Sequence, residues 1–201
     1  MENLHLIVGL GNPGAEYARA RHNAGFALVE ILAQHWRAEW TNERKFNVRL
    51  ARAERNGVRV LLCQPQTFMN LSGEAVGAVV NFYQLSLTGL LVVVDDADLP
   101  LGEIRLRAGG GTGGHHGLES VGQHLGTDEF ARLRLGIGRA DGAREITDHV
   151  LGRFDAAETA QMEKVLVRAA DQVECWLAHG IEKAMNQFNG VVDPVNEEKK
   201  K

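Results

Sequence analysis

The chain has 201 residues, of which 44% are hydrophobic and 24% charged, and its formal net charge is −4 at pH 7. This length and composition predict a soluble globular protein of one domain with a substantial core. The negative net charge excludes a global attraction to nucleic acid, so any RNA contact has to come from a local basic patch. No apolar run approaches the roughly 20 residues of a membrane span, and the first residues lack the pattern of a signal peptide. We therefore expect a cytoplasmic protein without membrane contact.

Apolar runs and helical periodicity predict strands that alternate with helices. Strands are expected at about 4–9, 47–54, 58–64, 90–95, 102–108 and 132–138, and helices at about 24–37, 72–84, 115–125, 155–179 and 181–188. Asn56-Gly57 is a hairpin turn signal, and Ser72 is the expected N-cap of its helix. This order predicts an α/β fold whose mixed, largely parallel twisted sheet is covered by helices on both faces.

Residues 1–193 are expected to form this single domain, and residues 194–201 a flexible charged tail that ends in Glu197-Glu198-Lys199-Lys200-Lys201. The two cysteines of the chain, Cys63 and Cys175, lie in a strand-like and a helix-like run. Isolated cysteines in such positions predict buried thiols in a reducing compartment rather than a disulfide or a metal site.

The first expected strand leads into Gly9-Leu10-Gly11-Asn12-Pro13-Gly14. This spacing matches the glycine-rich turn of dinucleotide-binding proteins, in which backbone N–H groups bind a pyrophosphate. However, Pro13 removes one of the donors, and the acidic residue at the required distance, Glu30, lies in a predicted helix instead of closing a second strand. A nucleotide-dependent enzyme is therefore a disfavoured alternative. The loop presents Asn12 shortly before Arg21-His22-Asn23, which indicates a reaction site.

Ligands of such sheets bind outside the carboxyl ends of the strands, where the sequence places Asn12, Asp95 and the glycines at 109–111. The segment Asp95-Asp96-Ala97-Asp98 fits a solvated acidic turn, a divalent-cation site, or a carboxylate that orients His22 and stabilises its imidazolium. His22 itself is either a surface histidine that precedes a helix or a catalytic base.

The segment Gln66-Thr67-Phe68-Met69-Asn70 follows another strand. It fits core residues with a helix-capping amide, or the apolar wall and polar reader of a small-molecule pocket. His115-His116 invites a zinc hypothesis, but neighbouring helix positions face different ways and no further ligand pattern accompanies them. We expect no metal.

Basic residues gather late in the chain, at Arg105, Arg107, Arg132, Arg134, Arg139 and Arg144. Arg105 and Arg107 are two apart on a strand, so their side chains project from the same face. This pattern fits a solvent-facing strand, or a surface that contacts a phosphate backbone.

Together these segments resemble the bacterial-type peptidyl-tRNA hydrolase family. The likeness covers nearly the whole chain and rests on motifs in the family's order and spacing: Val8-Gly9-Leu10-Gly11-Asn12-Pro13-Gly14 with Tyr17, Arg21-His22-Asn23-Ala24-Gly25, Gln66-Thr67-Phe68-Met69-Asn70-Leu71-Ser72-Gly73, Asp95-Asp96-Ala97-Asp98-Leu99-Pro100, Gly110-Gly111-Thr112-Gly113-Gly114-His115 and Arg132-Leu133-Arg134-Leu135-Gly136-Ile137-Gly138.

The resemblance implies an enzyme that cleaves the ester between a peptide, or another N-blocked aminoacyl group, and the 3′-terminal ribose of tRNA. By this analogy His22 is the general base, Asp95 orients it, and Asn12 positions water and substrate and distinguishes blocked from free amino groups. The aminoacyl side would be contacted by Tyr17, Phe68, Met69, Asn70 and His116, and the tRNA by Arg105, Arg107 and Arg134. Residues 141–154 resemble the family's mobile lid.

The family acts without metal or cofactor, without an obligate protein partner, and usually as a monomer, so the resemblance implies the same here. One position departs from the family pattern, because His116 stands where an asparagine is usual. An imidazole cannot donate and accept with the geometry of an amide. The departure leaves open an alternative in which the chain is an RNA-binding relative that lost hydrolysis, as in the plant organellar splicing factors that resemble this family.

Overall fold

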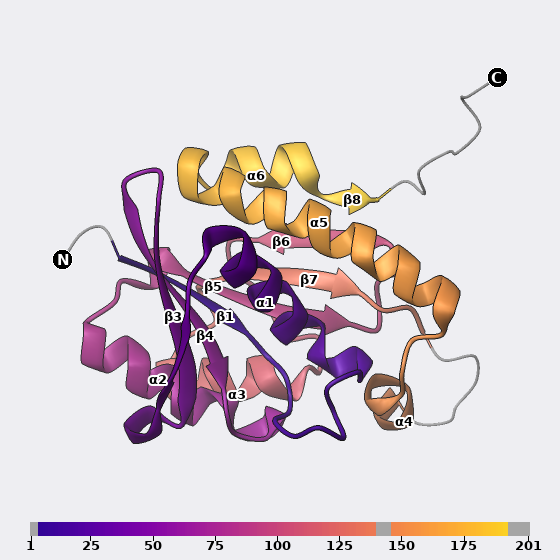
Figure 1. The fold of residues 1–201 in the computed structure, drawn as a ribbon, viewed down its shortest axis with the longest axis horizontal. Coiled ribbons are helices and arrows are strands. Elements are labelled where there is room, and N and C mark those ends of the chain that lie inside the picture. Colours follow the sequence, from indigo (N-terminus) through magenta and orange to yellow (C-terminus); the bar gives the residue numbers. More distant parts are fainter. Residues whose placement is uncertain (1–3, 140–145, 193–201) are drawn as a thin grey trace.

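A computed structural model describes residues 4–139 and 146–192, which form one α/β domain (Figure 1). Its sheet has eight strands in the order β2-β3-β4-β1-β5-β7-β6-β8. The strands are β1 (Leu4–Gly9), β2 (Trp40–Glu43), β3 (Val48–Arg55), β4 (Val58–Pro65), β5 (Leu90–Asp96), β6 (Glu103–Arg107), β7 (Ala131–Gly136) and β8 (Gly190–Val191).

The predicted mixed sheet is confirmed, and its parallel part consists of the central strands β4, β1, β5 and β7. The outer strands pair antiparallel, β2 and β3 on one side and β6 and β8 on the other. The predicted hairpin joins β3 to β4, with Asn56 and Gly57 at φ values of 51° and 75°. Both residues are left-handed, as a two-residue hairpin turn requires.

Helices cover both faces of the sheet, as predicted. Figure 1 shows α1 (Ala24–Trp36), α5 (Ala156–His179) and α6 (Ile181–Phe188) on one face, and α2 (Ser72–Tyr83) and α3 (His116–Leu125) on the other. The short helix α4 (Ile146–Leu151) contacts the 3-10 helix η1 (Arg21–Asn23) that follows β1. The remaining 3-10 helices are η2 (Arg44–Phe46), η3 (Met69–Leu71) and η4 (Leu87–Gly89).

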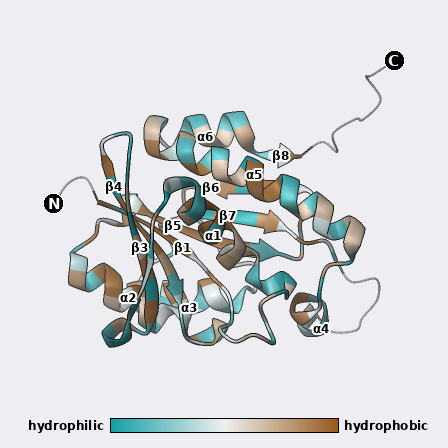
Figure 2. Cartoon of the chain, in the orientation of Figure 1, coloured by the Kyte–Doolittle hydropathy of each residue, from teal (hydrophilic) through white to brown (hydrophobic). Residues whose placement is uncertain are grey.

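The core has two parts, one on each face of the sheet. On β1, Ile7 packs toward α1 and α5, whereas Leu6 and Val8 pack toward α2 and α3. Burial on both faces explains the continuous apolar run Leu90-Leu91-Val92-Val93-Val94 of β5. Figure 2 shows hydrophobic residues along strands in the middle of the sheet. Cys63 and Cys175 are free buried thiols, as predicted, and burial raises the pKa of the Cys63 thiol.

The predicted cap of α2 is wrong. The helix begins at Ser72 itself, its N-cap is Leu71, and no side chain caps it there. Instead, the backbone N–H of Gly73 donates to Ser120 Oγ of α3 at 2.9 Å, so the first turn is completed by the neighbouring helix. The strands β2 and β8 and the helix α4 were not predicted.

Parts of the prediction lie outside the described residues: the tail 194–201, Arg144, the first part of the expected lid 141–154, and residues 1–3, 140–145 and 193 of the expected domain. The described remainder of the lid segment forms α4 and residues 152–154 after it. Within residues 4–139 and 146–192, no helix is both long and apolar enough to span a bilayer.

Candidate active site

Two glycines bring α1 onto the carboxyl end of β1. A Cβ atom on Gly25 would lie 2.4 Å from Val93 O and 2.6 Å from the backbone of Leu10, and one on Gly9 would lie 2.2 Å from Gly25 O. Only glycine permits this approach of backbone to backbone. Gly9 of the glycine-rich motif therefore serves packing here, and together with Gly25 it fixes the start of α1 at the strand end, two residues after His22.

The loop after β1 is held by a pair of asparagines. Asn12 N donates to Asn23 Oδ1 at 2.9 Å, and Asn23 Nδ2 donates to Asn12 O at 2.9 Å. Asn12 Oδ1 in turn accepts from the backbone N–H of Met69 at 2.8 Å. These bonds fix the orientation of the Asn12 amide, since its oxygen faces Met69. Its Nδ2 has no hydrogen-bond partner among the described residues, so Asn12 offers a donor to a ligand.

His22 of η1 and Asp95 of β5 are hydrogen-bonded, with His22 Nδ1 2.7 Å from Asp95 Oδ1. The Asp95 side chain is 2% exposed, and that of His22 is 12% exposed. An ionised carboxylate only accepts hydrogen bonds, so His22 Nδ1 carries the proton and Nε2 is left with its lone pair. Within the described chain Nε2 has no partner. This is the arrangement of an oriented general base.

Burial by itself would raise the pKa of the Asp95 carboxyl, but hydrogen bonds from His115 and His22 outweigh it and hold that pKa well below its usual range. His115 Nε2 lies 3.1 Å from the same oxygen, Asp95 Oδ1, that His22 contacts. Asp95 is therefore ionised at neutral pH, and two imidazole rings share its charge.

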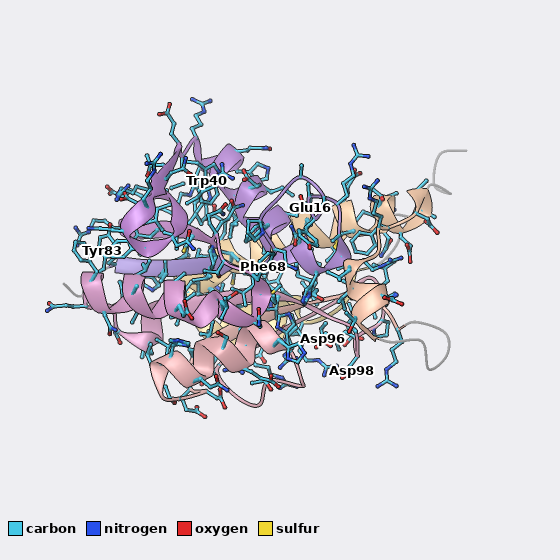
Figure 3. The ribbon with its side chains drawn as sticks, turned by 90° about the horizontal axis from the view of Figure 1, so that it is seen from below. Glu16, Trp40, Phe68, Tyr83, Asp96 and Asp98 are labelled. Atoms are coloured by element: carbon cyan, nitrogen blue, oxygen red, sulfur yellow. The ribbon has the colours of Figure 1, made fainter. Side chains whose placement is uncertain are left out.

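A cavity of about 530 Å³ opens beside this pair. Its apolar wall comes from the segment after β4 and from α4, and its polar wall from the ends of β1 and β5 and the loop before α3. Figure 3 labels three members of the lining, Phe68, Asp96 and Asp98. The described lining residues are Asn12, His22, Phe68, Met69, Asn70, Asp95, Asp96, Ala97, Asp98, Gly113, Gly114, His115, His116, Arg134, Thr147, Val150 and Leu151.

The structure brings most of the sequence-predicted substrate residues to this cavity. Phe68 is 57% exposed and Asn70 is exposed, whereas Met69 is buried beneath them. Met69 is thus a core residue, as one interpretation of the segment expects. That interpretation is wrong for the other two residues, because Phe68 is exposed and no side chain caps α2. Tyr17 is half-buried in the turn after the glycine loop and does not line the cavity. The His116 side chain is 75% exposed at the rim, with Nδ1 3.1 Å from Glu119 Oε2.

The polar cluster also has the composition of a metal site, because His22, Asp95 and His115 bring one ligand atom each within 4.8 Å of one another. Two of these atoms lie 2.7 Å apart, a hydrogen-bond distance and shorter than the spacing of ligands around a metal with bonds of about 2.1 Å. The other two acidic residues of the segment 95–98 form ion pairs with arginines, Asp96 with Arg134 at 3.1 Å and Asp98 with Arg139 at 2.6 Å. The donor set fits a hydrogen-bonded relay better than a cation.

Four of the predicted arginines lie together on β6 and β7 around a hollow next to the cavity. In the antiparallel pair of β6 and β7, Arg105 lies opposite Arg134 and Arg107 opposite Arg132, and opposite residues project from the same face. Two positive charges at opposite positions of a strand pair repel each other and destabilise the sheet. A second hollow of about 440 Å³ lies over them, lined also by the glycines at 109–111.

The four arginines differ in how they are held. Arg132 is fully buried and donates to the carbonyls of Gly110, Asp128 and Phe130, and burial lowers the pKa of its guanidinium. Arg105 pairs with Glu103 at 2.9 Å. Arg107 is exposed and makes no ion pair with any described residue. Arg134 pairs with Asp96 and also donates to the carbonyl of Gly111. Of the four, Arg107 is thus the exposed one without an ion pair to a described residue, and Arg132 holds the glycine loop.

Two residues of the site have no role in the sequence-based prediction. Asn23 enters the sequence analysis only as part of a motif. A signal for its role is that one asparagine, Asn12, lies in the loop after β1 and a second, Asn23, directly follows His22. His115 enters the sequence analysis only together with His116 as a possible zinc pair. The helix expected at 115–125 places it inside the helix, whereas the structure has it at the N-cap.

The fold and this site define a class: single-domain α/β enzymes in which a carboxylate-oriented histidine faces a cavity whose described lining contains no serine or cysteine nucleophile. A model of the family "Peptidyl-tRNA hydrolase" matches residues 6–200. The chain belongs to this family.

Curated relatives and a solved structure agree with that assignment. A peptidyl-tRNA hydrolase of Synechocystis sp. is 47% identical over 184 residues, 92% of this chain and 95% of that protein. One from Geobacillus kaustophilus is 44% identical over 186 residues, 92% of this chain and 100% of that protein. The crystal structure of the peptidyl-tRNA hydrolase from Acinetobacter baumannii superposes with a TM-score of 0.90 at 40% identity, covering 96% of this chain and 97% of that one.

Proposed function

We propose that this enzyme hydrolyses the ester bond of peptidyl-tRNA and of other N-blocked aminoacyl-tRNAs, and so returns free tRNA from stalled or aborted translation. The observation that carries the proposal is the hydrogen bond of 2.7 Å between His22 Nδ1 and Asp95 Oδ1 beside the cavity. Membership of the family supports the same substrate class.

The chemistry follows from the free nitrogen of His22. Nε2 takes a proton from a water molecule while the water oxygen forms a bond to the ester carbonyl carbon. Asp95 stabilises the imidazolium formed in this step. The tetrahedral intermediate then breaks its bond to the ribose 3′ oxygen, which takes the proton from Nε2. The products are a peptide carboxylate, after loss of a proton to solvent, and a tRNA with a free 3′ hydroxyl.

Asn12 supplies the donor that this reaction needs at the carbonyl. Its Nδ2 is free because its oxygen is held by Met69 N, so the amide does not have to reorganise when charge develops on the carbonyl oxygen. A positioned base contributes about 100- to 10,000-fold in rate, and a pre-oriented donor at the oxyanion contributes a further part. These two effects require neither a covalent nucleophile nor a cofactor.

The cavity and the arginine surface divide the substrate between them. The apolar wall that includes Phe68 and Val150 suits peptide side chains, with Asn70 and His116 as polar contacts at its rim. The surface of Arg105, Arg107 and Arg134 next to it suits the tRNA backbone. We include in the proposal that the enzyme acts in the cytoplasm as a monomer, without metal, cofactor or obligate protein partner.

The experiment is a comparison of N-acetyl-aminoacyl-tRNA with the unblocked aminoacyl-tRNA, followed by release of the labelled acyl group. We expect hydrolysis of the blocked substrate only, and its loss in His22→Ala. The matched control is His35→Ala, which changes an exposed histidine at the end of α1. Tight tRNA binding without ester cleavage in the wild type would instead support the alternative of an RNA-binding relative. Cleavage of both substrates at equal rates would overturn the assigned substrate class.

A further inference from the structure

His115 is the N-cap of α3, and it lies on the same carboxylate oxygen as His22. Its side chain is 9% exposed, with Nε2 3.1 Å from Asp95 Oδ1, and its ring centre is 5.1 Å from that of His22. The mechanism above uses the charge of Asp95 only to stabilise His22. A second ring on the same oxygen changes how much of that charge His22 receives.

The cap fixes which nitrogen of His115 carries the proton. His115 Nδ1 accepts from the backbone N–H groups of Gly117 at 3.1 Å and Leu118 at 3.3 Å. A nitrogen that accepts from two N–H groups carries no proton of its own, so the neutral ring holds its proton on Nε2. His115 is therefore a hydrogen-bond donor to Asp95. Protonation of Nδ1 would break both cap bonds and place positive charge at a helix N-terminus, which is unfavourable.

We infer that His115 is a positioning residue for the proposed hydrolysis. The α3 cap keeps its ring neutral, with Nε2 as the hydrogen-bond donor to Asp95. This bond takes up part of the negative charge of Asp95, so Asp95 stabilises the His22 imidazolium less. This inference rests on the proposed function. Its consequence is that His22 releases its proton more readily. The free base that activates water thus persists to lower pH than a simple histidine–aspartate pair would allow.

The other charged groups around the cluster have partners of their own. From β5 and the turn after it, Asp96 and Asp98 face Arg134 and Arg139. From α3, His116 faces Glu119. From η1, Arg21 faces Glu158 of α5 at 2.7 Å, and from α4, His149 Nε2 lies 2.8 Å from Gly138 O. Among the described residues, His115 is thus the one group besides His22 whose side chain forms a hydrogen bond with the Asp95 carboxylate.

The test variant is His115→Asn, because asparagine keeps a side-chain oxygen that caps a helix but is too short to reach Asp95. We expect the midpoint of the acid limb of the kcat/KM profile to move to higher pH by about half to one unit, since one hydrogen bond to Asp95 is lost. His115→Ala should show the same shift with a lower melting temperature, because it also removes the cap. His124→Asn, in the same helix, is the matched control and should leave the acid limb in place.

A second readout needs no turnover and so separates this inference from the proposed function. At pH 7.5, long-range ¹H–¹⁵N spectra should show His115 protonated on Nε2 and His22 on Nδ1. The titration midpoint of the His22 ring should move upward in His115→Asn as the acid limb does. An unmoved midpoint in His115→Asn, or a proton on His115 Nδ1, would overturn the inference. A loss of rate at every pH without a shift would leave His115 a structural cap and nothing more.

Discussion

The side-chain amide of Asn23 forms two hydrogen bonds with the backbone of Asn12. Its Oδ1 accepts from Asn12 N at 2.9 Å, and its Nδ2 donates to Asn12 O at 2.9 Å. Both residues are buried. The amide thus supplies the backbone partners that the loop after β1 lacks, and because Asn23 follows His22, it ties the position of the loop to the position of the proposed base.

Asn23→Asp tests this link. A carboxylate still accepts from Asn12 N but cannot donate to Asn12 O, so one buried carbonyl loses its partner and faces an oxygen. We expect the free energy of unfolding to fall by about 1–3 kcal/mol and turnover to fall with it. Urea unfolding and single-turnover kinetics measure both. Asn42→Asp, at an exposed position of β2, is the control. Full activity in Asn23→Asp would separate the loop from catalysis.

Asp95→Asn removes the charge at the centre of the site and keeps an oxygen that accepts hydrogen bonds. The amide cannot stabilise a His22 imidazolium, so we expect kcat to fall by at least about tenfold, equivalent to about 1.4 kcal/mol. The loss should be smaller than in His22→Ala, which removes the base itself. Equal rates of Asp95→Asn and wild type would contradict the relay of Asp95 and His22.

The stability difference between wild type and Asp95→Asn should depend on pH. The pKa of Asp95 is lowered in the folded state, so its carboxylate stabilises the fold above the unfolded pKa of about 3.9, and this contribution is lost as the pH falls further. The contribution of the Asp95 charge to the difference in unfolding free energy between wild type and Asp95→Asn should be fully present at about pH 5. It should shrink as the pH falls below about 4. Urea unfolding from pH 5 downward measures it, and a difference that grows below pH 4 would reverse the sign of the argument.

Arg107→Gln tests the arginine surface apart from the catalytic cavity, because Arg107 lines only the second hollow. We expect weaker binding of tRNA and a slope of log affinity against log salt that is shallower by about 0.7 to 0.9, the loss of one phosphate contact. Hydrolysis of a minimal ester without the tRNA body should not change. Arg59→Gln is the control, since Arg59 is an exposed arginine at the start of β4, which β1, β5 and β7 separate from β6. Equal effects on full and minimal substrates would place Arg107 in the fold or the active site.

Gly25→Ala tests the close packing that sets the start of α1. The added Cβ would lie 2.4–2.6 Å from backbone atoms that cannot shift without distorting β5 and the chain directly after β1. We therefore expect the free energy of unfolding to fall by about 3 kcal/mol or more. Gly77→Ala in α2 is the matched control, since its Cβ meets nothing nearer than 3.5 Å. It should stabilise the protein by about 0.5–1 kcal/mol. Thermal unfolding distinguishes the two, and a stable Gly25→Ala would refute the packing argument.

The sequence predicts the parts of this fold that have strong local signals. Helices expected at 24–37 and 72–84 are found at Ala24–Trp36 and Ser72–Tyr83, because periodic apolar residues fix their buried faces. The strand β2 is Trp40-Thr41-Asn42-Glu43, which has no alternation and forms by pairing with β3. Tertiary pairing of this kind leaves no pattern in the strand itself.

The candidate site divides in the same way. Asn12, His22 and Asp95 could be placed together because the carboxyl ends of parallel strands share one edge of the sheet. The role of His115 could not be predicted, since it depends on whether the helix begins at residue 115 or 116. That difference of one residue turns a helical side chain into a cap that holds its ring over Asp95.

His116→Asn tests the one position that departs from the family pattern. The structure leaves the His116 side chain 75% exposed and places its Nδ1 against Glu119, so solvent and Glu119 screen any charge on it from His22. We expect kcat/KM of this variant to stay within about threefold of wild type and its pH profile to run parallel to that of wild type, in contrast to His115→Asn. Glu119→Gln, which removes the partner and leaves the ring, is the control. A tenfold loss in His116→Asn would mean that an amide cannot replace the imidazole as a substrate contact, and a shifted acid limb would mean that His116 is coupled to His22 across the cavity.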